Sequence, residues 1–260
     1  MAKPDNSGRD IFPATQRVRL DQLLVERGLY DTRSRARDAV ARGAVKVDGV
    51  IQGKPGAATD PAASLEIADP AKAYVSRAAL KLVAGLDAFG FDPTGRTALD
   101  IGASTGGFTQ VLLERGAAHV IAVDVGHGQL HPAIAGDARV ISLEGLNARE
   151  LSADHLDGRE IDSVVSDVSF ISLRLALPPA LDMARAGAFA VLLVKPQFEA
   201  GRAAIGKGGI LKDPAAGERI ARDLHDWLAA RPGWQATGIV PSPISGGDGN
   251  QEFLIGGLKA

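Results

Sequence analysis

The chain has 260 residues, a formal net charge of −2 and 45% hydrophobic residues. These values are typical of a water-soluble globular protein with one domain of about 200 residues and a smaller one. The absence of cysteine excludes disulfides, thiolate zinc sites and a cysteine nucleophile. No apolar run reaches the roughly 20 residues that cross a bilayer, and the N-terminal residues lack the apolar core of a signal peptide. We therefore expect a cytoplasmic protein without membrane contact.

Charge is distributed unevenly along the chain. Basic residues outnumber acidic ones between residues 17 and 54, whereas the rest of the chain is net negative. A small basic region beside a larger acidic body is typical of a binding site for a polyanion such as nucleic acid. A basic surface without any partner is the alternative that charge alone leaves open.

Residues 1–16 show no hydrophobic periodicity and are predicted to be a disordered lead. Two helices are predicted next. The first ends at Gly28, and the second begins after an N-cap, Asp31 or Thr32, and ends at Gly43. Apolar residues recur three and four positions apart in both segments, which predicts one buried face on each helix.

The second predicted helix is rich in arginine and is followed by a short strand that ends at the turn signal Asp48–Gly49. This order resembles the S4 RNA-binding domain over about residues 19–56. The resemblance implies a small α+β RNA-binding domain, placed at 17–62, whose helix contacts RNA phosphates through Arg33, Arg35 and Arg37. A purely structural arginine helix is the alternative. Residues 63–73, rich in Ala, Asp and Pro, are predicted to link it to a second domain, 74–260.

Apolar strand patterns alternate with helical patterns in residues 74–260. This alternation predicts an α/β domain with a mostly parallel sheet covered on both faces. Strands are predicted at 97–102, 120–125, 140–144, 163–168, 188–195 and 252–259. Helices are predicted at 75–89, 107–115, 174–185 and 214–230.

The stretch LDIGASTGGFT, residues 99–109, follows the first of these strands, where α/β sheets bind ligands. A dinucleotide site requires G-x-G-x-x-G, and here Ser104 replaces the middle glycine, which argues against NAD. Asp100, just before Gly102, is unfavourable beside a phosphate and suits a ligand with a positive amino group. The turn resembles the S-adenosylmethionine turn of Rossmann-like class I methyltransferases.

That resemblance implies S-adenosylmethionine as the cofactor. It also implies that the acid ending the second strand holds the cofactor's ribose hydroxyls, and Asp124 occupies this place. Asn147, in GLNAR, is expected to reach the adenine. The predicted cofactor-binding residues are Asp100, Gly102, Ser104, Gly106, Thr109, Asp124 and Asn147.

The stretch GRAAIGK, residues 201–207, matches the beginning of a P-loop. The next residue is Gly208, so the hydroxyl that ligates magnesium is missing, and no helical pattern follows at once. We therefore discard nucleoside triphosphate binding and expect no metal. The stretch is interpreted as a mobile loop whose Arg202 and Lys207 contact RNA phosphate, with a solvated basic loop as the alternative.

The ends of the later strands indicate the chemistry. Without cysteine, the usual route to carbon-5 methylation of pyrimidines is absent, and SDVSF after the fourth strand lacks the prolines typical of amine methyltransferases. The strand ends provide Asp167 and Lys195 instead. Lys81 lies in the helix leading into the sheet, and Glu252 begins the last strand. Partial desolvation of Lys195 favours its neutral form, which can accept a proton.

Lys81, Asp167, Lys195 and Glu252 resemble the K-D-K-E tetrad of FtsJ-like ribose 2′-O-methyltransferases. With the small domain, the resemblance narrows to the TlyA family over about residues 17–258, although Thr105 replaces a common proline. The family's activity is methylation of cytidine 2′-hydroxyls in large-subunit rRNA, with the small subunit as a further candidate. The resemblance implies that Lys195 is the base, that Asp167 and Glu252 orient it, and that Lys81 steers the hydroxyl. Ribosomal RNA and ribosomal subunits are the implied partners, and no protein partner is implied.

Two other functions remain open at this point. The first is an RNA-binding ribosome assembly factor with an inactive methyltransferase domain, against which the intact tetrad argues. The second is a hemolysin, a label that the family also carries. No transmembrane run supports the second function.

Overall fold

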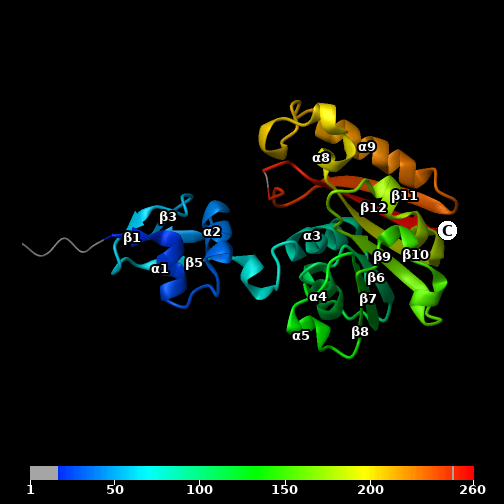
Figure 1. Ribbon diagram of the computed structural model, residues 1–260, viewed down its shortest axis with the longest axis horizontal. Coiled ribbons are helices and arrows are strands. Elements are labelled where there is room, and N and C mark those ends of the chain that lie inside the picture. The colour runs from blue at the N-terminus through cyan, green and yellow to red at the C-terminus, as the bar shows by residue number, and fades with distance from the viewer. Residues whose placement is uncertain (1–16, 248) are drawn as a thin grey trace, which may run out of the picture. The chain divides into compact units, whose positions relative to one another are not determined.

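The computed structural model describes residues 17–247 and 249–260. The chain divides into two compact units between Ala71 and Lys72 (Figure 1). The predicted disordered lead, residues 1–16, lies outside the described residues. In the part of the chain that is described, no helix is long and apolar enough to span a membrane.

The smaller unit is built from short elements. Its helices are α1 (Leu20–Glu26) and α2 (Arg33–Ala41), which pack against each other. Thr32 is the N-cap of α2, because its side chain accepts a hydrogen bond from the Arg35 N–H at 3.3 Å. Its strands form two antiparallel sheets: β1 pairs with β4 in one, and the other has the order β3–β2–β5. The strand bounds are Val18–Arg19 (β1), Val45–Val47 (β2), Val50–Ile51 (β3), Ala58–Thr59 (β4) and Leu65–Ile67 (β5).

The hairpin between β2 and β3 turns at the predicted pair. Asp48 and Gly49 have φ values of 50° and 80°, as a tight two-residue hairpin turn requires. The hydrophobic cluster of this unit is buried between the helices and β2; its members are Leu20, Leu24, Tyr30, Ala36, Ala39, Val40 and Val45. β5 lies inside residues 63–73, the stretch predicted as a linker, so part of that stretch belongs to the small β3–β2–β5 sheet.

The larger unit contains a seven-stranded sheet with the order β11–β12–β10–β9–β6–β7–β8. The five strands from β10 to β8 are parallel, and β12 is antiparallel to both β10 and β11. The strand bounds are Thr97–Ile101 (β6), His119–Asp124 (β7), Val140–Glu144 (β8), Ile161–Ser166 (β9), Ala184–Val194 (β10), Trp234–Pro241 (β11) and Phe253–Lys259 (β12). The predicted Rossmann-like, mostly parallel fold is confirmed.

Helices cover both faces of this sheet. The α-helices are α3 (Ala79–Phe89), α4 (Gly107–Glu114), α5 (Pro132–Ala135), α6 (Leu173–Ala176), α7 (Pro178–Met183), α8 (Pro196–Glu199) and α9 (Ala216–Ala229). Short 3-10 helices cover Pro70–Ala73 (η1), Ala148–Glu150 (η2), Ala153–Leu156 (η3), Arg202–Ala204 (η4) and Lys207–Gly209 (η5).

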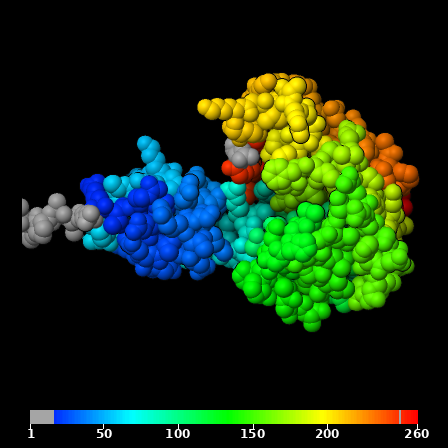
Figure 2. Space-filling model, viewed as in Figure 1, coloured from blue at the N-terminus to red at the C-terminus, as the bar shows by residue number. Residues whose placement is uncertain are grey.

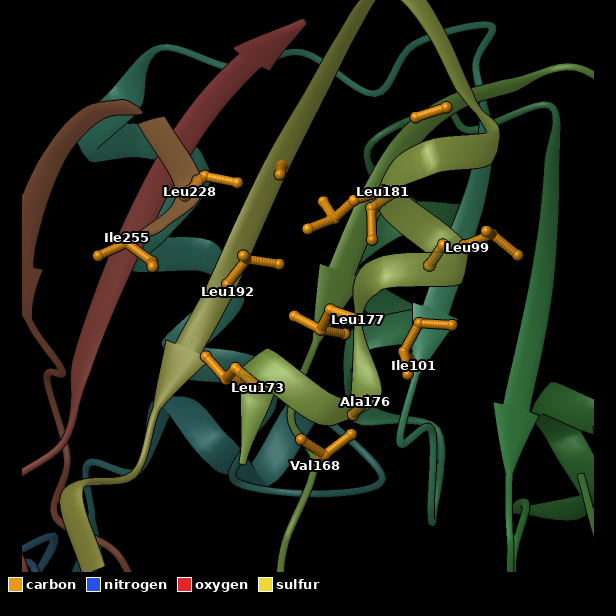
Figure 3. Close-up of a cluster of buried hydrophobic side chains, with 14 of the residues drawn as sticks. Leu99, Ile101, Val168, Leu173, Ala176, Leu177, Leu181, Leu192, Leu228 and Ile255 are labelled. Atoms are coloured by element: carbon orange, nitrogen blue, oxygen red, sulfur yellow. The ribbon is translucent and has the colours of Figure 1, made fainter. Parts of the chain in front are cut away.

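Alternating side chains of the strands supply two hydrophobic clusters. Leu192 packs with α6, α7 and α9, as Figure 3 shows, whereas its neighbours Val191 and Leu193 pack with α3 and α4 on the other face. Both neighbours and Leu192 itself are fully buried. This alternation places the core on both sides of the sheet and keeps the strands rigid, so that their ends can hold functional side chains.

The structure differs from the sequence prediction at residues 174–185 and 234–241. The single helix predicted at 174–185 is two helices, because Pro178 begins α7, and β10 already starts at Ala184. β11 was not predicted, because its residues WQATGIVP lack an apolar alternation. It is an edge strand with only Trp234 fully buried, so its sequence carries a weak strand signal.

Candidate active site

The glycine turn connects β6 to α4 at the carboxyl edge of the sheet. Gly102 has a φ of 86°, and a Cβ atom there would lie 3.0 Å from the Asp167 carbonyl oxygen. Gly106 caps α4 with a φ of 94°. Only glycine fits such conformations without strain, and Gly102 also lets the turn approach the end of β9 closely.

Asp100 and Thr109 lie beneath this turn. The Asp100 side chain is fully buried, and Thr109 Oγ1 donates a hydrogen bond of 2.6 Å to one of its oxygens. The other oxygen has no hydrogen-bond partner among the described residues. Burial raises the pKa of Asp100 to about 7, and the nearby charge of Asp167 adds to this, whereas the Thr109 hydrogen bond opposes it. The structure therefore places both residues inside the domain, where they support the turn.

A cavity of about 420 Å³ opens beyond the carboxyl ends of β6, β7 and β9. Four of the seven predicted cofactor residues line it: Gly102, Ser104, Asp124 and Asn147. The Asp124 carboxylate accepts hydrogen bonds from the Ser104 N–H at 2.8 Å and the Gly126 N–H at 2.7 Å. Each carboxylate oxygen has a second lone pair, so Asp124 can still accept hydroxyl donors in the cavity.

Other lining residues carry no motif and were missed by sequence reasoning. Gln129 Oε1 accepts a hydrogen bond of 3.2 Å from Ser104 Oγ. Leu146, Phe170 and Ile171 add apolar surface. All four lie in loops that follow strands of the parallel sheet, and this position is the signal by which the sequence could have identified them. Asn147 Oδ1 accepts from the Arg149 N–H at 3.1 Å and so caps η2.

A second hollow of about 150 Å³ shares four residues with this cavity: Gly102, Ser104, Asp167 and Ser169. Lys195 and Ser76 are among its other lining residues. The two hollows are therefore adjacent, and their linings together run from the glycine turn to the end of β10.

Lys195 and Asp167 form one ion pair of the predicted tetrad. Lys195 Nζ lies 2.5 Å from Asp167 Oδ1 and donates a hydrogen bond of 2.8 Å to Ser169 Oγ. The two charged side chains are only 11% and 14% exposed. Two oxygens from the β9–α6 loop thus fix the position of the ammonium group.

Lys81 and Glu252 form the second ion pair. Lys81 Nζ, from α3, lies 2.5 Å from Glu252 Oε2, and the side chains are 6% and 2% exposed. Val194 pairs with Phe253 across β10 and β12, so Lys195 and Glu252 occupy neighbouring positions just beyond the paired residues. The fold thus gathers two lysines and two carboxylates from four distant segments, and their charges balance, as burial of such groups requires.

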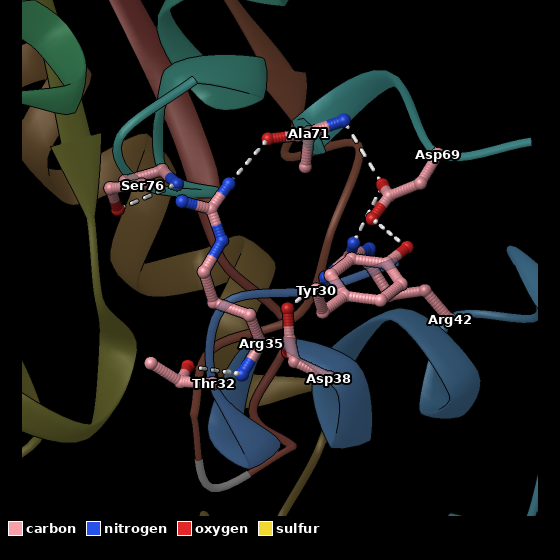
Figure 4. Close-up of polar contacts among 9 residues, drawn as sticks. Tyr30, Thr32, Arg35, Asp38, Arg42, Asp69, Ala71 and Ser76 are labelled. Carbon is pink, nitrogen blue, oxygen red and sulfur yellow. Dashed lines mark hydrogen bonds and ion pairs between the residues drawn. The ribbon is translucent and has the colours of Figure 1, made fainter. Parts of the chain in front are cut away.

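The predicted RNA-binding arginines of α2 have different surroundings. Arg33 forms an ion pair of 3.2 Å with Asp21, a buried carboxylate whose pKa is lowered mainly by the hydrogen bond from Arg19. Arg35 donates to the Ala71 carbonyl oxygen at 3.5 Å, as Figure 4 shows, and Arg37 is exposed. Arg33 thus takes part in the internal structure of the unit as well as in its surface.

A neighbouring polar cluster fixes the end of this unit (Figure 4). Asp69 accepts hydrogen bonds of 2.8 Å from both the Tyr30 hydroxyl and Arg42, and a third of 3.0 Å from the Ala71 N–H. Burial and the Asp69 hydrogen bond raise the pKa of Tyr30.

Two family models match the chain. The FtsJ-like methyltransferase model covers residues 74–259, and the S4 domain model covers residues 18–58. The chain belongs to the FtsJ-like methyltransferases. The expected S4 domain ahead of the methyltransferase domain is also confirmed.

Relatives of this FtsJ-like methyltransferase match both units together. The 16S/23S rRNA (cytidine-2′-O)-methyltransferase TlyA of Mycobacterium tuberculosis is 45% identical over 245 residues, which are 92% of this chain and 89% of the relative. Hemolysin A of Brachyspira hyodysenteriae is 38% identical over 91% of this chain and 98% of the relative. A solved structure described as a hemolysin from Streptococcus thermophilus has a TM-score of 0.72 at 39% identity, covering 95% of this chain and 90% of that one. The predicted TlyA family membership is confirmed.

The methyl donor of this FtsJ-like methyltransferase is S-adenosylmethionine, and the residues present in the cavity fit it. Leu146 and Ile171 offer apolar surface to an adenine, and Asp124 offers lone pairs to ribose hydroxyls. The carboxylate of Asp124 lines the same cavity, and a negative charge there favours a ligand with a positive sulfonium.

Proposed function

We propose that this methyltransferase methylates the 2′-hydroxyl of a cytidine ribose in large-subunit ribosomal RNA, with small-subunit RNA as a second substrate. The observation that carries the proposal is the pairing of Lys195 with Asp167 at the smaller hollow, with Glu252 of the Lys81–Glu252 pair at the neighbouring position on the sheet. The Mycobacterium tuberculosis relative is named as a 16S/23S rRNA (cytidine-2′-O)-methyltransferase, and this name supports the choice of substrate.

Lys195 is the proton acceptor in this proposal. A ribose hydroxyl is too weak an acid to ionise unaided, so a base must take its proton as the oxygen attacks. When bound, S-adenosylmethionine supplies the electrophilic methyl group. Lys195 Nζ is held by Asp167 and Ser169 and lines the smaller hollow, where it receives the hydroxyl proton. Positioning of the two reactants supplies much of the rate.

Lys81 and Glu252 act on the other side of the tetrad. Their pair is more buried than that of Lys195 and Asp167, so it experiences little screening by solvent. Glu252 orients Lys195 from the neighbouring position on the sheet, and Lys81 balances the carboxylate charge and steers the hydroxyl. In the cavity, Ser104, Asp124 and Asn147 hold the cofactor, while Asp100, Gly106 and Thr109 shape the turn that holds it.

The small unit supplies affinity for the RNA. Exposed cations bind a phosphate backbone chiefly by releasing counterions, which needs no reading of bases. Arg33, Arg35 and Arg37 on α2 serve this purpose, together with Arg202 and Lys207 on the larger unit. Ribosomal subunits in the cytoplasm are the physiological partners.

An inactive assembly factor with the same domains remains the second candidate, and the two paired lysines argue against it. The relatives named as hemolysins share the same two units, so that name does not require another architecture.

Transfer of labelled methyl from S-adenosylmethionine to ribosomal RNA tests the proposal. We expect label in RNA from subunits that lack the modification, at a cytidine that becomes resistant to alkaline cleavage. The matched control is an RNA with 2′-deoxycytidine at the mapped position, which should accept no label. Label in the deoxy control, or none in the unmodified ribosomal RNA, would contradict the assignment.

A further inference from the structure

Residues 201–212 form a compact loop that begins six residues after Lys195; we call it the basic loop. It contains the short helices η4 and η5 and a bridge between Ile205 and Leu211. The Gly206 N–H donates to the Ile210 carbonyl oxygen at 2.7 Å. Figure 2 shows this yellow segment projecting from the surface of the larger unit. The loop is therefore folded on itself.

The charge of the basic loop is positive and faces solvent. Its charged residues are Arg202, Lys207 and Lys212, all exposed, and it contains no acidic residue. Lys212 Nζ donates to the Ala203 carbonyl oxygen at 2.9 Å and so braces the loop. Arg202 and Lys207 remain as outward cations.

One buried amide fastens the basic loop from outside. Asn250 is 4% exposed. Its Nδ2 donates to the Gly209 carbonyl oxygen at 2.9 Å, and its Oδ1 accepts from the Leu211 N–H at 3.1 Å. An amide is needed here because one side chain must both donate and accept.

The same segment carries Glu252 of the tetrad. The Asn250 carbonyl oxygen accepts from the Gly246 N–H at 2.9 Å, and a Cβ atom on Gly246 would lie 2.6 Å from Glu252 Oε1. The basic loop is thus connected to the site twice: along the chain to Lys195, and through Asn250 to the turn against Glu252.

We propose that the basic loop is a preformed arm for the RNA backbone beside the target ribose, and that Asn250 is the positioning residue that holds it there. This inference rests on the proposed function, because it takes RNA as the substrate. A loop already ordered before binding loses less conformational entropy when Arg202 and Lys207 meet phosphates, and this raises the affinity. Asn250 itself touches neither RNA nor cofactor.

A double-mutant cycle between Asn250→Ala and the pair Arg202→Ala/Lys207→Ala tests the inference. We expect each change to weaken rRNA binding about tenfold, since each removes about 1.4 kcal/mol of favourable interaction. The combined variant should be little weaker than either, because both changes disable the same arm. KM for RNA should rise while single-turnover kcat at saturating RNA stays within about threefold.

Three controls separate a released loop from a damaged protein. S-adenosylmethionine affinity should stay unchanged in every variant, because neither Asn250 nor the basic loop lines the cofactor cavity. Hydrogen exchange at the Leu211 amide should become faster in Asn250→Ala. Arg222→Ala, an exposed ion-paired arginine on α9, should leave RNA affinity nearly unchanged. If Asn250→Ala does not fold, Asn250→Ser, which keeps a small hydroxyl, replaces it in the cycle.

Fully additive losses, or no loss from Arg202→Ala/Lys207→Ala, would overturn the inference. Such a result with active wild-type enzyme would leave the proposed methyl transfer to ribosomal RNA intact. Wild-type enzyme that transfers no methyl to ribosomal RNA would instead reject the proposed function, and this inference with it.

Discussion

The two units of this methyltransferase carry their charges in different ways. In the smaller unit, the guanidinium-bearing side chain of Arg33 is 54% exposed, and Arg37 is exposed as well. In the larger unit, the side chains of Lys81 and Glu252 are 6% and 2% exposed. Exposed charges are screened by salt, and each adds separately to the attraction for a long polyanion. Buried ion pairs are screened little, and each holds its charged groups at a fixed position. The difference indicates binding in one unit and chemistry in the other.

Asp21 is the exception within the smaller unit. This buried carboxylate is paired with Arg19 at 3.0 Å and with Arg33 at 3.2 Å. It holds both guanidinium groups in place at the surface, so one buried charge organises the exposed ones. The two units therefore differ in how many of their functional charges are buried, and the predictions below test this difference.

The largest expected effect is that of the substitution Lys195→Arg on the rate of methyl transfer. An arginine side chain stays protonated in proteins and cannot accept a proton, although it keeps the charge. Methyl transfer should slow by roughly 10²–10⁴ in single-turnover assays, while S-adenosylmethionine and RNA binding persist.

Two comparisons control this variant. Lys46→Arg makes the same change at an exposed lysine of the smaller unit and should leave the rate unchanged. Asp167→Asn and Glu252→Gln should give smaller losses than Lys195→Arg if these carboxylates only orient the lysine. Transfer by Lys195→Arg near the wild-type rate would leave Lys195 an electrostatic role only.

The combined change Arg33→Ala, Arg35→Ala and Arg37→Ala addresses the smaller unit. RNA binding should weaken, and the slope of log K against log salt should become shallower by about 2 to 3, since each lost phosphate contact retains its counterions. S-adenosylmethionine affinity should not change. Arg219→Ala, an exposed arginine on α9, is the matched control.

Arg33 also pairs with Asp21, so thermal unfolding of the triple variant must be measured beside its RNA binding. Arg37→Ala alone avoids this complication and should still reduce the salt slope by nearly one. An unchanged slope in both variants would assign α2 a purely structural role.

Asp124→Ala tests the cofactor cavity and should have a smaller effect than either change above. Loss of the carboxylate removes hydrogen-bond acceptors for ribose hydroxyls, and calorimetry should give an S-adenosylmethionine affinity roughly tenfold weaker. Asp124→Asn keeps one acceptor and should lose less. RNA affinity is the internal control, because Asp124 lies in the cofactor cavity. Binding of NADH in place of S-adenosylmethionine would contradict the whole assignment of the glycine turn.

The last prediction concerns Asp100 and the stability of the fold. Its pKa is about 7 in the folded protein because of burial, whereas a carboxyl group in an unfolded chain has a pKa near 4, so the folded state retains a proton that the unfolded state releases. The free energy of unfolding should therefore fall as pH rises from about 4 to 7, and this contribution should level off above that range. Asp100→Asn cannot titrate and should show a flatter profile in thermal unfolding. An equal slope in both proteins would place the titration elsewhere.

Much of the architecture follows from local patterns in the sequence. Apolar runs predict β7 and β10, because strands covered on both faces are apolar over most of their length. The turn Asp48–Gly49 and the N-cap Thr32 are likewise local, since each is determined by the backbone preferences of a few neighbouring residues. The glycine turn, residues 99–109, is a local pattern as well, so the sequence alone indicates that this turn binds a ligand.

Other features depend on which distant residues come together, and only the tertiary structure decides them. β11 has little apolar character of its own and is a strand because β12 pairs with it. In the sequence, only the family resemblance places Lys81 and Glu252 in one site, because they are 171 positions apart. In the structure, α3 and the beginning of β12 bring their charged atoms to 2.5 Å. Asp100 appears in the sequence as a ligand-facing acid, yet packing around β6 buries it beneath the turn. Burial and pairing of charges depend on the whole surrounding volume, and no short stretch of sequence specifies that volume.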